Sequence, residues 1–319
     1  MIWHAAEAKR KARHVIQQTL TSQQAFERYE AVKGRFPVLP FGPQEPKVAA
    51  NLGDLSDHYD IFVFDAFGVL NVGESPIAGA CERMAALRSA GKSLFVLTNA
   101  ASYCFAQVEQ KFKRLGFDFE PGELVSSRAV CEQEMAGLDP SILWGVIAPK
   151  AFDQGELAFK TSVLGDDPTD YEKVDAFLFL SSECWTRPRQ RLLVEALQAR
   201  LRPVIVANPD LVAPRENGLT LEPGYFAHDL IDQVPGLSLV FHGKPFASVY
   251  DEIERRVGKD VSRDRIVMMG DSLHTDIWGA RVRGWGSVLV TDHGFLRGQD
   301  VLASISQSEI YPDWIVGSI

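Results

Sequence analysis

The segment YDIFVFDAFGVLNVG, residues 59–73, has the pattern of a strand that is followed by a candidate functional residue. Four β-prone apolar residues at 61–64 are followed directly by Asp65. The turn after it carries a further large aromatic, Phe67, where the pattern would be expected to become polar. An aspartate after a strand is usually a turn residue or a helix cap. The role of Asp65 therefore depends on what the other strands bring beside it.

From residue 59 onward, short apolar runs alternate with helical stretches. The runs are IFVFD (61–65), SLFVLTN (93–99), WGVIAP (144–149), DAFLFLS (175–181), RPVIVANPD (202–210), LSLVFHGKP (237–245), RIVMMGD (265–271) and GSVLVTD (286–292). Amphipathic segments such as PIAGACERMAALRSAG (76–91) and RPRQRLLVEALQAR (187–200) lie between several of them. This alternation predicts an α/β fold with a parallel sheet that is covered on both faces.

Composition limits the class of protein. The 319 residues, 46% of them hydrophobic, suit two globular domains or one domain with a large insert. A formal net charge of -9 argues against a nucleic-acid partner. No apolar run approaches the ~20 residues of a membrane span, and the first residues lack the apolar core of a secretory signal. The four scattered cysteines indicate reduced thiols in a cytoplasmic protein.

The N-terminal part differs in its sequence pattern from the rest of the chain. Residues 4 to about 34 are predicted to be helical, and the proline-rich segment that follows predicts a linker near residues 35–50. A surface helix is favoured over a transit peptide. The sequence leaves open whether this helix packs on the core or mediates self-association into a homo-oligomer.

Ligands of open parallel sheets bind beyond the carboxyl ends of the strands. The residues at these positions are Asp65, Thr98-Asn99, Asn208-Pro209-Asp210, Gly243-Lys244 and Gly270-Asp271. If Asp65 and Asp271 converge, they repel unless a cation lies between them, and oxygen ligands favour Mg²⁺. Lys244 adds a positive charge for a phosphate, and Thr98 with the amides after it can bind phosphate oxygens. One aspartate would then attack phosphorus and form an aspartyl-phosphate that water hydrolyses.

These residues resemble the motifs of the haloacid dehalogenase (HAD) superfamily of phosphohydrolases. DAFGVL at Asp65 is similar to its first motif with one departure, VLTNAAS at Thr98 to the second, HGKP at Lys244 to the third, and GDSLHTDIWGA at Asp271 to the fourth. The segments NVGESPIAGA, TNAAS, ANPD and GKP further resemble the nitrophenylphosphatase-like branch, subclass IIA. The resemblance covers roughly residues 59–295.

The resemblance implies a Rossmann-like parallel-sheet core with an inserted α/β cap of the C2 type and an N-terminal helical extension. Only 33 residues separate Asp65 from Thr98, whereas about 145 residues lie between Thr98 and Lys244, enough for an entire α/β insert. The expected domains are an extension and linker at 1–50, a core at 51–128 and 240–319, and a cap at 129–239. The expected activity is Mg²⁺-dependent hydrolysis of a small phosphomonoester, such as a sugar phosphate or a nucleotide.

The resemblance also implies a role for each motif residue. The catalytic residues are expected to be Asp65 as nucleophile, Thr98 and Lys244. The phosphoryl group would be bound by Thr98, Asn99, Ala100 and Lys244. The Mg²⁺ ligands would be Asp65, the Phe67 carbonyl, Asp271 and Asp276, where Asp276 supports either the metal or Lys244.

Phe67 is the departure from the family pattern. Phosphatases of the family carry a second aspartate here, which protonates the leaving oxygen and then activates water. Phe67 keeps the main-chain carbonyl but loses this proton relay, and general acid–base help is typically worth ~10²–10⁴-fold. The sequence therefore predicts slow turnover or another acid. His242, His274 and Glu74 lie near the motifs and are candidates, although a hydrogen-bonded structural role is favoured for each.

Two alternatives stay open. Dehalogenases of the superfamily read similarly to DAFGVL, which favours attack on carbon, but their cap lies between the first and second motifs. A non-hydrolytic protein that binds a phospho-ligand in a degenerate site would explain Phe67 but not the five retained polar groups. Cap residues Glu183, Trp185 and Arg187 are candidates for substrate contact, although a helix start with a packed tryptophan is the favoured interpretation.

Overall fold

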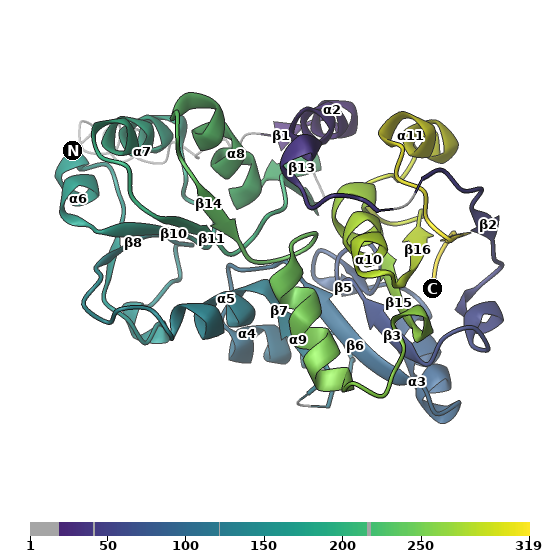
Figure 1. Cartoon of the computed structure of the whole chain (residues 1–319). Coiled ribbons are helices and arrows are strands. Elements are labelled where there is room, and N and C mark those ends of the chain that lie inside the picture. The colour runs from purple at the N-terminus through teal and green to yellow at the C-terminus, as the bar shows by residue number, and fades with distance from the viewer. Residues whose placement is uncertain (1–18, 41, 121, 216–217) are drawn as a thin grey trace, which may run out of the picture.

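The computed structural model describes residues 19–40, 42–120, 122–215 and 218–319. These residues form two parallel sheets, each with its own helices (Figure 1). All eight apolar runs lie in these sheets as strands, which confirms the predicted parallel α/β fold. No helix in the described ranges has the length and apolar character needed to cross a membrane.

The core sheet has seven strands, all parallel to their neighbours. Their order is β2 (Lys47–Val48), β17 (Trp314–Val316), β16 (Gly286–Val290), β15 (Ile266–Gly270), β3 (Ile61–Phe64), β6 (Ser93–Thr98) and β7 (Leu124–Ser126). Strand β3, which comes from the segment 59–73, lies inside the sheet between β15 and β6. Its four residues alternate between two apolar clusters on opposite faces, which is why the run is apolar throughout.

Helices cover both faces of the core sheet. On one face, Phe62 and Phe64 pack with residues of α3 (Ala80–Ser89) and α4 (Phe105–Arg114). On the other face, Ile61 and Val63 pack with residues of α5 (Ser127–Met135), α9 (Ala247–Val257) and α10 (Trp278–Arg283). Short elements complete this part: a hairpin of β4 (Asn71–Val72) and β5 (Ser75–Pro76), the 3₁₀ turns η2 (Leu52–Leu55) and η4 (Arg263–Arg265), the π-helical turn η5 (Leu273–Ile277) and α11 (Val301–Ser308).

The inserted segment forms a second, smaller sheet, also parallel throughout. Its order is β14 (Leu239–Phe241), β11 (Val204–Val206), β10 (Ala176–Phe179), β8 (Trp144–Ile147) and β9 (Thr161–Val163). The remaining elements of the insert are η3 (Gln154–Glu156), α6 (Pro168–Lys173), α7 (Arg187–Ala199), α8 (Pro223–Gln233), β12 (Val212–Arg215) and β13 (Gly218–Leu221). Because β14 pairs with β11, the inserted sheet extends to Phe241, two residues past the expected boundary at 239.

The expected N-terminal helix is wrong in part. Residues 4–18 lie outside the described ranges, and residues 19–20 form a strand, β1, that pairs antiparallel with β13 of the insert. The helix α2 (Ser22–Val32) begins only at Thr21, whose side chain accepts a hydrogen bond from Gln24 N while the Gln24 side chain accepts one from Thr21 N. This reciprocal pair of hydrogen bonds is a capping box, and it fixes the N-terminal end of α2 at Thr21.

Helix α2 lies between the two halves of the molecule, where α8 and α11 flank it in Figure 1. Arg28 pairs with Asp232 of α8, and the Lys33 side chain, in the 3₁₀ turn η1 (Lys33–Arg35), donates to the Ser308 carbonyl of α11. The expected linker near 35–50 is also more structured than predicted, because β2 adds an edge strand to the core sheet. The extension therefore joins the inserted segment to the core.

Candidate active site at the end of the core sheet

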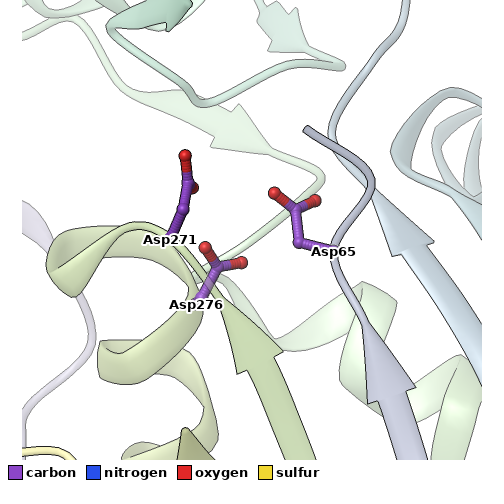
Figure 2. A group of neighbouring side chains, drawn as sticks. All are labelled: Asp65, Asp271 and Asp276. Atoms are coloured by element: carbon purple, nitrogen blue, oxygen red, sulfur yellow. The ribbon is translucent and has the colours of Figure 1, made fainter. Parts of the chain in front are cut away.

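Three carboxylates gather at the carboxyl end of the core sheet (Figure 2). Asp65 follows β3, and Asp271 follows β15, which pairs with β3. Asp276 lies in η5, and π-helical turns of this kind are frequent at functional sites. One oxygen from each carboxylate lies within 4.8 Å of the others. The structure thus brings together three side chains that are up to 211 residues apart (276 − 65) in the sequence.

Lys244 reaches into this group from the loop before α9. Its Nζ lies 2.5 Å from Asp65 Oδ1 and 2.6 Å from Asp276 Oδ1, and its side chain is 2% exposed. Burial alone lowers the pKa of Lys244, but the carboxylates of Asp276, Asp65 and Asp210 outweigh burial and raise it. The lysine is therefore charged.

One lysine does not neutralise three carboxylates. Burial raises the pKa of Asp271 well above its usual value, and the charges of Asp65 and Asp276 raise it further. Such a cluster of oxygen donors in a buried place fits a hard divalent cation, which removes the repulsion between them. The donor set is thus of the chemical kind that Mg²⁺ prefers.

Thr98 and Phe67 line the same cavity as Asp65. Thr98 ends β6, the other neighbour of β3, and its Oγ1 accepts a hydrogen bond of 3.2 Å from Ala100 N. The ring of half-buried Phe67 faces Lys111, whose Nζ lies 4.8 Å from the ring centroid. An aromatic ring at this position offers no proton to a leaving group.

Asn99 fixes the position of the Lys244 backbone. Its Oδ1 accepts a bond of 2.8 Å from Lys244 N, and its Nδ2 donates to the Lys244 carbonyl at 3.0 Å. The same Nδ2 donates to Asp210 Oδ1 at 2.8 Å. Gly243 permits this arrangement, because its φ is +131° and a Cβ there would lie 2.7 Å from Asn99 Oδ1. The expected substrate-binding residue Asn99 therefore connects the core to the inserted segment.

None of the candidate replacements for the missing acid lines the cavity that holds Asp65. His242 is buried, which lowers its pKa. His274 is also buried, and its Nε2 lies 2.8 Å from Glu30 of α2. Glu74 is exposed and pairs with Lys111 at 2.9 Å. The hydrogen-bonded structural interpretation of these three residues therefore fits the structure better than a proton relay.

The three cap residues expected to be candidates for substrate contact lie in different surroundings. Trp185 is buried, and its Nε1 donates to Gln190 at 2.7 Å, so it packs inside the inserted segment as the structural interpretation predicts. Arg187 is exposed at the start of α7. Glu183 borders a second cavity that shares Ser102, Tyr103 and Glu222 with the first. Of the three candidates, only Glu183 lies beside the site.

Tyr29 of α2 is a residue of the cavity that was not predicted from the sequence. Tyr29 lines the cavity with Asp65, its hydroxyl accepts a bond of 3.0 Å from Leu211 N, and its ring stacks on His274. Nothing in the local sequence marks it, because an aromatic residue on an amphipathic helix normally indicates core packing. Asp210 did carry a signal, since it follows a strand of the inserted sheet, but no motif gave it a role.

The packing of Gly294 against Asp271 gives a testable prediction. An added Cβ at residue 294 would lie 2.0 Å from Asp271 Oδ2, which accepts a bond from Phe295 N. Gly294→Ala is therefore expected to lower the free energy of unfolding by about 1–3 kcal/mol, because overpacking displaces buried atoms. Urea denaturation measures this loss, and Mg²⁺ is expected to raise the melting temperature of the wild type but not of the variant.

Gly34→Ala is the matched control, because no atom lies within 4 Å of the added Cβ and no positive φ is involved. Its unfolding free energy is expected to change by less than about 1 kcal/mol. Wild-type stability together with a normal Mg²⁺ response in Gly294→Ala would contradict the tight placement of Asp271.

Two family models match the chain, and the first of them extends into the start of the insert. Residues 62–154 match a haloacid dehalogenase-like hydrolase family, and residues 241–319 match a HAD-hydrolase-like family. The first match contains Asp65, Phe67 and Thr98, and the second contains Lys244, Asp271 and Asp276. Every cluster residue thus falls within a matched range.

Individual relatives agree with these matches. Human glycerol-3-phosphate phosphatase is 27% identical over 286 residues, which are 82% of this chain and 88% of that protein. A 4-nitrophenylphosphatase from Schizosaccharomyces pombe is 25% identical over 285 residues, which cover 82% and 93% of the two chains. The crystal structure of a glycerol phosphate phosphatase from Mycobacterium tuberculosis in complex with magnesium matches with a TM-score of 0.64 at 22% identity, covering 82% and 75%.

Proposed function

The chain belongs to the haloacid dehalogenase superfamily, and on this basis we propose that it is a Mg²⁺-dependent phosphohydrolase acting on a small phosphomonoester. The observation that carries the proposal is the convergence of Asp65, Asp271 and Asp276 around the buried Lys244 at the end of the core sheet. Curated relatives named as phosphatases for glycerol 3-phosphate and for 4-nitrophenyl phosphate support the same reaction class.

The proposed reaction uses Asp65 as the nucleophile. A carboxylate oxygen of Asp65 attacks phosphorus, the bond to the leaving oxygen breaks, and the phosphoryl group is held on Asp65 until water displaces it. Lys244 holds the phosphoryl oxygens by charge, and Thr98 with the Asn99 and Ala100 amides offers further donors. Asp276 keeps Lys244 in place through its 2.6 Å contact.

The carboxylates fit a divalent cation, and we assign Mg²⁺ to Asp65, Asp271 and the Phe67 carbonyl, with Asp276 in support. When bound, the cation would offset the charge of the carboxylates together with Lys244 and would polarise the phosphoryl oxygens. A relative whose crystal structure holds magnesium supports this assignment.

The alternative of carbon–halogen hydrolysis has less support. The inserted sheet follows β6 and α5, after the second motif, whereas the dehalogenase layout requires a cap between β3 and β6. The cavity that holds Asp65 is also lined by the charged groups Lys244 and Asp271, which suit a phosphorylated ligand. Both features favour phosphoryl chemistry.

The same proposal covers the partners and the location. A small phosphorylated substrate is the expected ligand, and the net charge of -9 disfavours nucleic acid. The four cysteines are free thiols, which agrees with a reducing compartment, and we place the protein in the cytoplasm.

Phosphate release from a panel of phosphomonoesters tests the proposed function. The panel contains 4-nitrophenyl phosphate, glycerol 3-phosphate, sugar phosphates and nucleotides, each assayed with Mg²⁺. At least one substrate is expected to turn over, and chelation by EDTA is expected to lower the rate more than about tenfold until Mg²⁺ is restored. Inertness across the panel, with phosphate binding still detectable by calorimetry, would instead favour the non-hydrolytic binding protein.

A further inference from the structure

Phosphoester hydrolysis at Asp65 leaves one proton transfer without a donor, because Phe67 occupies the position that normally supplies it. The leaving oxygen needs a proton, and the attacking water must later lose one. Among the described residues that line the cavity, Asp65 and Asp271 belong to the nucleophile and cation group, and Lys244 is paired with two carboxylates. Tyr103 is exposed, and Asp210, Glu222 and Tyr29 remain as side chains able to give up a proton.

Two of these three fit the task poorly. The Glu222 carboxylate accepts bonds from Asn208 Nδ2 at 3.2 Å and from Thr220 Oγ1 at 3.1 Å, so each oxygen has a structural partner. Burial raises the pKa of Tyr29 well above 10, and the charge of Asp210 raises it further, which makes this phenol a poor acid at neutral pH.

Asp210 is held firmly at the cavity by its neighbours. The backbone N–H of Asp210 donates a hydrogen bond to Asn208 Oδ1 at 2.9 Å, and its carbonyl accepts one from Gly224 N at 3.0 Å. The next residue, Leu211, donates to the Tyr29 hydroxyl. A Cβ at Gly224 would lie 2.7 Å from the Asp210 carbonyl oxygen, so the start of α8 packs tightly against this loop.

The Asp210 carboxylate is connected directly to the catalytic loop. One of its oxygens, Oδ1, accepts from Asn99 Nδ2, which also donates to the Lys244 carbonyl. Asp210 follows β11 of the inserted sheet, whereas Asp65 follows β3 of the core sheet, so the two carboxylates reach one cavity from different domains. Such an arrangement suits a nucleophile and an acid that act on one phosphorus centre.

We propose that Asp210 is the general acid and base of the reaction, in place of the missing aspartate at position 67. This proposal rests on the proposed phosphohydrolase function. As Asp65 attacks phosphorus and the bond to the leaving oxygen breaks, Asp210 gives its proton to that oxygen and an alcohol departs. Water then attacks the phosphorus of the aspartyl-phosphate, its proton passes to Asp210, and the bond between phosphorus and Asp65 breaks. Both carboxyl groups return to their starting state.

The electrostatic surroundings of Asp210 agree with this role. Burial raises its pKa to about 8, against the opposing effects of Lys244 and the Asn99 hydrogen bond, and the charges of Asp65 and Asp276 raise it further. The remaining charged or titratable groups that line the cavity around it are Asp271, Glu222, Tyr29 and Tyr103. A bound divalent cation would lower the value. Burial thus keeps the proton on Asp210 to a higher pH than on an ordinary carboxylic acid, as a general acid requires.

Asp210→Asn tests the proposal, because asparagine keeps the oxygen that accepts from Asn99 but carries no acidic proton. With glycerol 3-phosphate or another alkyl phosphate, kcat/KM is expected to fall by about 10²-fold or more, because an alkoxide needs a proton to leave. With 4-nitrophenyl phosphate the first step is expected to change less than about tenfold, since 4-nitrophenolate departs unprotonated. A burst of one equivalent of 4-nitrophenolate, followed by slow turnover, is therefore expected in the variant.

The pH profile and a matched variant separate catalysis from mere structure. In the wild type, kcat/KM for an alkyl phosphate is expected to fall as pH rises through the Asp210 pKa, at or below about 8, and this limb is expected to be missing in Asp210→Asn. Glu222 is another carboxylate at the cavity, and Glu222→Gln is expected to change kcat/KM equally for the two substrates. An equal loss of kcat/KM on both substrates in Asp210→Asn would overturn the proposal.

A comparison of Asp210→Asn in two backgrounds, the wild type and Phe67→Asp, separates a loss of proton transfer from a loss of folding. Asp210→Asn is expected to cost less than about tenfold in a Phe67→Asp background, because the new aspartate supplies the proton. The same cost in both backgrounds would overturn the role of Asp210 while leaving the phosphohydrolase intact. Inertness of the wild type and of Phe67→Asp on every phosphomonoester would reject both proposals together.

Discussion

Asp65→Asn is expected to abolish turnover, with a loss of at least about 10⁴-fold in kcat on 4-nitrophenyl phosphate. Asparagine is nearly the same shape, and its side-chain oxygen is able to keep the contact with Lys244 Nζ. The loss would therefore come from chemistry, because an amide does not attack phosphorus and brings no charge to the cation site. Phosphate release at saturating substrate, together with a melting curve, measures both activity and folding.

Intact-mass analysis adds a direct view of the covalent step. During turnover the wild type is expected to gain the mass of one phosphoryl group in a rapid acid quench, and Asp65→Asn is expected to gain none. Asp57→Asn, an exposed aspartate before β3, serves as the control and is expected to keep wild-type activity. Activity above a tenth of the wild-type rate in Asp65→Asn would rule out the aspartyl-phosphate on this residue.

Phe67→Asp is expected to raise kcat on alkyl phosphates by about 10²-fold. This is the lower end of the usual contribution of ~10²–10⁴-fold, because Asp210 already supplies part of the proton transfer. The main-chain carbonyl assigned to Mg²⁺ is unaffected by the exchange. Steady-state kinetics on glycerol 3-phosphate measure the gain.

The same exchange is expected to reduce stability. The Phe67 ring packs against the core cluster beside β3 and lies under the Lys111 ammonium, and such cation–π contacts contribute roughly 0.5–1 kcal/mol at exposed sites. Phe67→Asn is the matched control, because it removes the same ring without adding an acid. If Phe67→Asn is as fast as Phe67→Asp, relief of crowding rather than proton transfer explains the gain.

The strands of this protein could be read from its sequence. Each is a short apolar run that ends at a polar residue, since a parallel strand with helices on both faces is buried throughout. The order of the motifs then placed Asp65, Thr98, Lys244 and Asp271 at the ends of particular strands. The clustering of these side chains follows from the sheet, because β6 and β15 are the two neighbours of β3.

The N-terminal extension shows where sequence reasoning failed. Its composition favours a helix, yet residues 19–20 pair with β13 of the insert. Helical propensity is a weak preference that a strand partner overrides, and that partner lies about 200 residues away. Tyr29 could not be recognised as part of the cavity either, because its contacts with Leu211 and His274 are made with residues far away in the sequence.

The sequence by itself determined the parallel α/β fold, the position of the insert between Thr98 and Lys244, and the lysine and carboxylates that we propose for the site. These features depend on local patterns, in which apolar runs and the residues after them are contiguous in the chain. The tertiary structure alone decided that Asn99 joins Lys244 to Asp210, across separations of 145 and 111 residues. It also decided that Tyr29 and Asp210 share the cavity of Asp65. Such contacts depend on how two sheets and a helix pack together, and no local pattern records that packing.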